Sequence, residues 1–200
     1  GFSLRDLKDA GFLPEAIVNY LAIIGGSFKN EIMAIDELAQ AINFDHLPTT
    51  GQIKYDVEKL RWINHKWICQ SDPARITQLC RPYLEASYPA VKKLSDKGLQ
   101  SVIEHIQKEL VTLQDVVQLL AFYFDEPAYE MDIANSLIQA DKRDAFKEIL
   151  KNALQQKDGC AFLKILTCKI KDAGIAPKQA FSFVRYALTG SPAGPGVSEL

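Results

Sequence analysis

The chain has 200 residues, 48% of them hydrophobic and 24% charged, and its formal net charge is −2. This composition is typical of a globular chain, and it excludes disordered, collagen-like and disulfide-scaffold classes. Its apolar runs are shorter than the roughly 20 residues that a membrane span needs, and its first residues lack the basic-then-apolar order of a signal peptide. We therefore expect a cytoplasmic protein with no membrane segment.

Charge is distributed unevenly along the chain. Residues 1–70 carry 7 basic and 9 acidic side chains and residues 71–158 carry 11 and 14, whereas residues 159–200 carry 5 and 2. The near-neutral total argues mildly against a nucleic-acid partner, but contacts with a polyanion would concentrate in the basic last segment. Its cations are Lys164, Lys169, Lys171, Lys178 and Arg185. A solvated helix face is the alternative interpretation of these residues.

Apolar residues recur at helical spacing, and the alternating runs and Asn-Gly turns of β-sheets are missing, so the sequence predicts an all-α fold. In chain order, helix starts are expected at Pro14, at Asp72-Pro73, at Thr112 with Asp115 in capping-box spacing, and at Pro177. Helix ends with a left-handed backbone are expected at Gly25-Gly26, Gly174 and Gly190. Interruptions near residues 71 and 126 predict three helical parts, residues 1–70, 71–125 and 126–200.

Motifs for self-contained catalysis are missing. The sequence has no G-x-x-x-x-G-K-[ST] phosphate loop, no G-x-G-x-x-G and no H-E-x-x-H. His46, His65 and His105 are isolated, and each is expected to be a surface or capping residue. The four cysteines form no C-x-x-C pair and lie at no metal-ligand spacing, so we expect reduced thiols. The sequence therefore predicts no catalytic residue and no metal site.

Four stretches, in order, resemble the C-terminal half of bacterial glutamyl-tRNA synthetases, which are class I enzymes. They are residues 11–25 (GFLPEAIVNYLAIIG), residues 55–64 (YDVEKLRWIN), residues 81–84 (RPYL) with Thr112-Leu113 downstream, and residues 184–190 (VRYALTG) followed by Pro195-Gly196. Their order and spacing extend the resemblance over nearly the whole chain. The family's His-Ile-Gly-His and Lys-Met-Ser-Lys loops, which handle ATP, are absent from this sequence.

This resemblance implies a helical stem-contact remnant (residues 1–70) followed by an α-helical anticodon-binding region of two subdomains (residues 71–125 and 126–200). The expected partner is the anticodon loop of a tRNA, bound by a monomer. No cofactor is expected in this fragment, because ATP and Mg²⁺ would belong to the catalytic part of the parent enzyme. Trp62 and Trp67 are expected to be buried anchors of the scaffold and not RNA contacts.

The resemblance also implies the site residues near the end of the chain. In the family, an arginine of the R-x-A-L-T-G motif contacts anticodon bases, and Arg185 occupies that position here; its guanidinium suits bidentate or stacked contact. The following loop packs against those bases, and its matching residues are Gly194, Pro195, Gly196 and Val197. Alternatively, Arg185 is an ordinary surface arginine. Phe181 and Tyr186 are expected in the core and not as stacking platforms.

Glu109 is the most informative departure from the family. Members that accept only the glutamate tRNA carry an arginine three residues before the Thr-Leu pair, where it reads the third anticodon base. The glutamate anticodon ends in cytosine, whose N3 and O2 acceptors suit an arginine, whereas the glutamine anticodon ends in guanine, whose N1–H and N2–H₂ donors suit a carboxylate. Glu109 alternatively is an exposed carboxylate at a helix end, with Gln107, Lys108 or Gln114 lining the pocket.

The sequence thus predicts the anticodon-binding part of a glutamate–tRNA ligase that favours tRNA(Gln). Such an enzyme misacylates this tRNA with glutamate, and an amidotransferase would convert the product. The alternatives are a relaxed ligase that accepts both tRNA(Glu) and tRNA(Gln), and a helical protein-interaction module that kept the fold.

Overall fold

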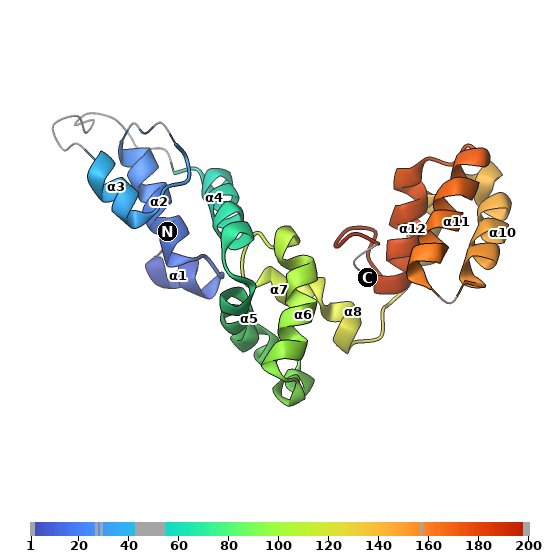
Figure 1. The fold of residues 1–200 in the computed structure, drawn as a ribbon, viewed down its shortest axis with the longest axis horizontal. Helices are drawn as coiled ribbons and strands as arrows, with labels where there is room; N and C mark the ends of the chain where they lie inside the picture. Colours follow the sequence, from blue (N-terminus) through green and yellow to red (C-terminus); the bar gives the residue numbers. More distant parts are fainter. Residues whose placement is uncertain (1–2, 27, 29, 43–54, 157, 198–200) are drawn as a thin grey trace. The chain divides into compact units, whose positions relative to one another are not determined.

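The computed structural model describes residues 3–26, 28, 30–42, 55–156 and 158–197. Within these ranges the chain forms α-helices and short 3-10 turns and contains no strand, which confirms the predicted all-α fold. The chain divides into two compact units, residues 1–118 and 119–200 (Figure 1). The predicted division at residues 70 and 125 is finer than this and stays a prediction. No helix in the described ranges is both long and apolar enough to span a bilayer.

The first unit consists of short helices joined by tight turns. They are α1 (Leu4–Asp9), α2 (Pro14–Gly25), α3 (Ile35–Ala41), α4 (Val57–Gln70), α5 (Pro73–Ser87), η2 (Pro89–Lys93), α6 (Asp96–Ile106), η3 (Gln107–Glu109) and α7 (Asp115–Leu119), at whose last residue the units divide. Helix α2 packs against α4, α5 packs against α6, and the 3-10 turn η3 packs against α4. The segment after α6 therefore rests on α4.

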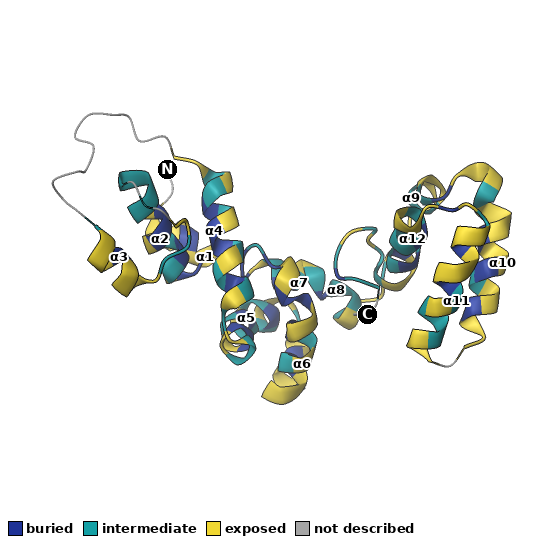
Figure 2. Ribbon diagram, turned by 45° about the horizontal axis from the view of Figure 1, so that its top comes forward, coloured by how far each residue is buried: buried dark blue, intermediate teal, exposed yellow. Residues whose placement is uncertain are grey.

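The core of the first unit follows from the spacing of its apolar residues. On α5, Ile76, Cys80 and Leu84 recur every four residues and are fully buried. On α4, Leu60 and Ile63 are buried in the same way, because residues three or four apart share one face of a helix. Buried, half-buried and exposed residues alternate along α4 (Figure 2).

Helix starts and ends agree with the sequence in most places. Pro14, Pro73 and Pro177 each lie in the first turn of a helix. The end of helix α2 differs from the prediction. Its C-cap residue, Gly26, has extended backbone with φ −150°, so the expected left-handed end at Gly25-Gly26 is wrong. Gly190 does have the left-handed backbone, with φ +73° at the end of α12.

The two tryptophans differ in burial. Trp67 is half-buried, and its Nε1 donates a hydrogen bond to Asn19 Oδ1 at 3.0 Å. Trp62 is 37% exposed, and its ring centroid lies 4.3 Å from Lys59 Nζ. The expectation of a buried anchor is therefore wrong for Trp62, whose exposed ring is approached by the Nζ atoms of Lys59 and Lys66.

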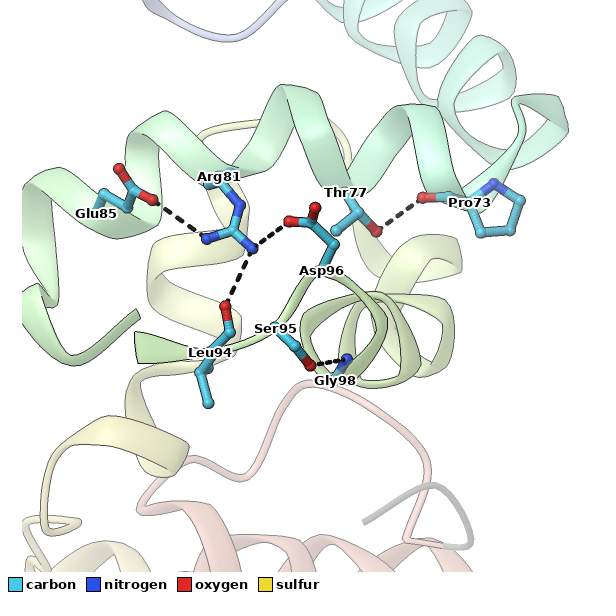
Figure 3. Close-up of polar contacts among 8 residues, drawn as sticks. All are labelled: Pro73, Thr77, Arg81, Glu85, Leu94, Ser95, Asp96 and Gly98. Atoms are coloured by element: carbon cyan, nitrogen blue, oxygen red, sulfur yellow. Dashed lines mark hydrogen bonds and ion pairs between the residues drawn. The ribbon is translucent and has the colours of Figure 1, made fainter. Parts of the chain in front are cut away.

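Arg81, in the predicted R-P-Y-L stretch, connects α5 to the start of α6. Its Nη2 donates to Asp96 Oδ1 at 2.6 Å and to the Leu94 carbonyl at 3.4 Å, and its Nη1 donates to Glu85 Oε1 at 3.2 Å. Figure 3 shows the guanidinium between the two carboxylates. Arg81 thus holds the segment that follows η2 in place.

The second unit contains α8 (Ala121–Phe124), α9 (Met131–Leu137), η4 (Ala140–Lys142), α10 (Arg143–Leu154), α11 (Gly159–Asp172) and α12 (Pro177–Thr189). Helix α11 packs between α10 and α12, and α8 and α9 contact α12. Its core includes Phe146, Leu166, Ile170 and Val184. The Phe146 and Phe183 rings meet edge to face at 5.3 Å, an arrangement that adds to the apolar burial.

Gly11 allows two distant parts of the first unit to approach closely. Its carbonyl accepts a hydrogen bond from the Leu113 N–H at 2.9 Å. Its φ is +83°, and a Cβ there would lie 2.6 Å from Gln114 N. On the other side, the buried Cys80 thiol donates to the Leu113 carbonyl at 3.8 Å, and burial raises the pKa of this thiol to about 12. The backbone around residue 113 is therefore packed from both sides.

We expect Gly11→Ala to destabilise the first unit by about 2–4 kcal/mol, because the added methyl group would overpack a site with left-handed backbone. Urea unfolding followed by tryptophan fluorescence measures this, since both tryptophans, Trp62 and Trp67, lie in the first unit. Gly25→Ala is the matched control, because no atom lies within 4 Å of the position of its Cβ. Equal unfolding free energies for wild type and Gly11→Ala would contradict this packing.

Candidate nucleic-acid interface

Glu109 is the last residue of η3, which continues directly from α6. The segment alternates in burial: Gln107 and Leu110 are buried, whereas Lys108 and Glu109 are exposed. Because its flanking residues are fixed in the core, the tight turn directs the side chains of Lys108 and Glu109 outward. The placement of Glu109 at a helix end agrees with both interpretations of this residue.

Polar side chains fasten this segment to α4. Gln107 Nε2 donates to the Ile68 carbonyl at 2.7 Å and to the Ser71 carbonyl at 2.9 Å. These carbonyls lie at the end of α4, where no further helical turn supplies donors. His65 Nδ1 lies 2.8 Å from the Leu110 carbonyl, so this nitrogen carries the proton. Gln107 is therefore occupied in holding the turn.

The buried Asn64 side chain joins three segments. Its Oδ1 accepts a hydrogen bond from the Leu13 N–H at 2.8 Å, and its Nδ2 donates to the Val111 carbonyl at 2.7 Å. Asp115 Oδ2 then accepts from the backbone N–H of Val111 at 3.0 Å and of Thr112 at 2.7 Å. The Asp115 contact is the half of the predicted capping box in which the acidic residue reaches back to the backbone. Residues 107–113 are thus held at several points.

The Glu109 carboxylate has no hydrogen bond or ion pair with the part of the chain that the structure describes. Its negative charge nevertheless affects the Cys69 thiol at the end of α4. The pKa of the Cys69 thiol there is raised chiefly by burial, and the carboxylate of Glu109 raises it further, while Lys66 and Lys108 lower it. Glu109 is therefore an exposed anion on a fixed turn, with lysines nearby.

Arg185 fastens a loop in the second unit. This half-buried side chain extends from α12 and donates twice, from Nε to the Pro195 carbonyl at 2.7 Å and from Nη1 to the Pro192 carbonyl at 2.9 Å. Both carbonyls belong to the loop of residues 190–197. Arg185 is therefore not a free surface arginine, because two of its three guanidinium nitrogens donate hydrogen bonds to the loop.

The loop closes one side of a hollow of about 380 Å³. The lining residues are Leu163, Thr167, Phe181, Arg185, Gly196 and Val197. Of the four predicted loop residues, Gly196 and Val197 line this hollow. Pro195 is buried, and Gly194 is half-buried with φ +129°. The structure therefore brings Arg185 together with the end of the loop.

Phe181 and Thr167 were missed as lining residues by sequence reasoning. Phe181 is half-buried and packs against the core of the second unit, as expected, and it also lines the hollow. It lies one turn before Arg185 on the same face of α12, so its spacing could have indicated this second role. Tyr186, by contrast, is buried as expected, and its hydroxyl donates to the Glu130 carbonyl at 3.0 Å. Thr167 comes from α11, and no sequence signal links it to α12.

The residues that the sequence predicted for the site lie in both units. Glu109 belongs to the first unit, whereas Arg185 and residues 194–197 belong to the second. His105 is exposed, and its Nδ1 contacts the Ser101 carbonyl at 2.6 Å. His46 lies outside the described residues. Across the described ranges, no three His, Cys, Asp or Glu side chains gather in a way that could hold a metal ion.

Comparison with known families identifies the class of protein to which this chain belongs. Residues 75–200 match the anticodon binding domain family, and the chain belongs to it. The predicted resemblance to glutamyl-tRNA synthetases is confirmed as well. The chain is 27% identical to glutamate–tRNA ligase 2 of Syntrophus aciditrophicus and 29% identical to glutamate–tRNA ligase 1 of Pseudothermotoga lettingae. Each match covers 99% of this chain, which spans 42% and 41% of the two relatives.

Solved structures confirm the fold. The crystal structure of a glutamate tRNA ligase from Elizabethkingia meningosepticum, in complex with its amino acid, has a TM-score of 0.71 at 18% identity. A glutamate-tRNA synthetase from Elizabethkingia anophelis has a TM-score of 0.69 at 19% identity. Both matches cover 96% of this chain and 38% of the other.

We expect Arg185→Lys to loosen the loop without changing the charge, because a lysine cannot donate in two fixed directions. Losing the two hydrogen bonds should speed amide exchange at Ser191, Gly194 and Val197 by about tenfold or more, given about 1.4 kcal/mol per tenfold change. Hydrogen exchange resolved by residue measures this.

The matched control is Arg143→Lys. Arg143 uses the same chemistry elsewhere in the second unit, donating from Nη2 to the Asn135 carbonyl and from Nε to the Ile138 carbonyl. This variant should speed exchange around residues 135–139 and leave the loop of residues 190–197 unchanged. Wild-type exchange rates in that loop for Arg185→Lys would show that the arginine does not hold it.

Proposed function

We propose that this chain is the tRNA anticodon-binding part of a glutamate–tRNA ligase. The observation that carries the proposal is the family match over residues 75–200 together with the similarity of nearly the whole chain to glutamate–tRNA ligases. Two features of the surface support it. An exposed carboxylate, Glu109, lies on a fixed turn, and a hollow lined by Phe181 and Arg185 offers planar groups. Unstacked loop bases are bound by such planar groups and by polar groups that reach their Watson–Crick edges.

We further propose a preference for tRNA(Gln), with Glu109 reading the third anticodon base. The exposed carboxylate can accept from both N1–H and N2–H₂ of guanine. Opposite cytosine it would face two acceptors, and an unmatched buried polar group costs about 1–3 kcal/mol, roughly 5- to 150-fold in affinity. The fixed backbone on both sides of Glu109 supports this role, because discrimination requires the carboxylate to stay in one place.

The parent enzyme would then place glutamate on tRNA(Gln), and an amidotransferase would convert the misacylated product. ATP and Mg²⁺ would bind in a catalytic part outside this chain, which contains neither phosphate-loop nor class I signature motifs. In this chain the residues of interest, Glu109, Arg185, Gly194, Pro195, Gly196 and Val197, bind and position RNA. We place the protein in the cytoplasm as a monomer that binds tRNA.

Binding of the whole chain to unmodified tRNA(Gln) and tRNA(Glu) tests this function. We expect wild type to favour tRNA(Gln) by about 5- to 150-fold. Glu109→Arg should remove or invert the preference, because it exchanges the acceptor for a donor. Glu104→Arg is the matched control: it makes the same charge change at an exposed α6 residue and should leave the ratio of affinities unchanged.

Two results would contradict these proposals separately. Equal affinities in wild type that Glu109→Arg does not alter would eliminate the preference and favour a relaxed ligase. Absence of binding to either tRNA at low salt would eliminate the RNA-binding function itself and favour a helical protein-interaction module.

A further inference from the structure

Acidic side chains are unevenly distributed within the second unit. Residues 119–158 contain five basic side chains and eight acidic ones, whereas residues 159–189, which form α11 and α12, contain five basic side chains and one acidic one, Asp172. The hollow beside Arg185 is built mainly from α11 and α12. The two helices that form the hollow therefore carry an excess of basic over acidic side chains, whereas residues 119–158 carry an excess of acidic ones.

Helical geometry divides the α11 lysines into two groups. Leu163 and Thr167 line the hollow. Lys164 lies three residues before Thr167 and Lys171 lies four after it, so both lie beside Thr167 on the same side of the helix. Lys169 follows Thr167 by two residues, and this spacing places it on the opposite side.

On α12, one lysine shares the face that carries Arg185. Lys178, Phe181 and Arg185 are spaced by three and four residues, which is the spacing of one helical face. Phe181 and Arg185 line the hollow, so Lys178 lies along the same edge, two turns before the arginine. Two helices thus supply three lysines, Lys164, Lys171 and Lys178, to the border of one hollow.

These three lysines are available for a ligand. All three are exposed, and none forms an ion pair with a described residue, whereas Lys151 pairs with Glu148 at 2.7 Å. Around the turn between α11 and α12, Asp172 opposes them, but Lys142 adds a further cation there, because its Nζ donates to the Gly174 carbonyl at 2.5 Å. The border of the hollow therefore has a net positive charge.

We propose that Lys164, Lys171 and Lys178 bind backbone phosphates of the RNA strand on either side of a nucleotide at the hollow. This inference rests on the proposed function and adds the residues that bind the RNA backbone. Long, flexible lysine side chains suit phosphates as point charges, and single-stranded RNA is bound by basic grooves combined with planar stacking groups. Phosphate contacts position a nucleic acid and carry no sequence information.

Salt dependence of tRNA binding by the whole chain tests the inference. Each phosphate contact in a single strand contributes about 0.7 to the slope of log affinity against log salt. The K164Q/K171Q/K178Q variant should therefore reduce the magnitude of the slope by about 2 and weaken tRNA(Gln) and tRNA(Glu) by the same factor. The matched control is K147Q/K151Q/K169Q, which removes the same charge from exposed lysines of the same unit and should change the slope by less than half as much.

The outcomes separate this inference from the proposed function. A wild-type chain that binds tRNA, with equal slope changes in the two triple variants, would overturn the lysine assignment and leave the proposed function standing. A wild-type chain that does not bind tRNA at low salt would overturn both. A changed ratio of affinities for the two tRNAs in K164Q/K171Q/K178Q would also contradict the assignment, because phosphate contacts cannot distinguish anticodons.

Discussion

The first unit depends on the buried amide of Asn64. One side chain joins the start of α2, through the Leu13 N–H, to the segment after η3, through the Val111 carbonyl. These backbone groups are far apart in the sequence and would otherwise be buried without partners, at a cost of about 1–3 kcal/mol each. The apolar faces of α2, α4 and α5 provide most of the burial. The Asn64 contact, together with the hydrogen bonds of Gln107 and His65, fixes residues 107–113 against α4. The position of Glu109 is a consequence.

The same arrangement recurs in the rest of the molecule. Short helices leave many turns between them, and carbonyls of these turns are bound by side chains of neighbouring helices: Arg81 binds the Leu94 carbonyl, and Arg185 binds those of Pro192 and Pro195. Such contacts turn irregular backbone into fixed structure. This matters for recognition of RNA, because groups that read a base edge must be held before the RNA arrives. Glu109 lies on such a turn in the first unit, and residues 194–197 lie on such a loop in the second.

Much of the fold could be predicted from the sequence, because helix starts and apolar periodicity are local signals. Pro14, Pro73 and Pro177 mark helix starts as expected. The errors have different causes. Gly26 has extended backbone although glycine also permits a left-handed end, and Trp62 is exposed because spacing alone does not show which face of a helix is covered. Likewise Arg185 was predicted from its motif, whereas the partners of its guanidinium depend on how the following loop folds back.

Unfolding of Asn64→Ala tests the central claim most directly. The substitution leaves the Leu13 N–H and the Val111 carbonyl without partners, so urea unfolding monitored by tryptophan fluorescence should show a loss of at least about 2 kcal/mol. The exposed Asn30 of the same unit provides the comparison, and Asn30→Ala should change the free energy of unfolding by less than about 0.5 kcal/mol. Equal unfolding free energies for the two variants would show that Asn64 does not hold the segment that carries Glu109.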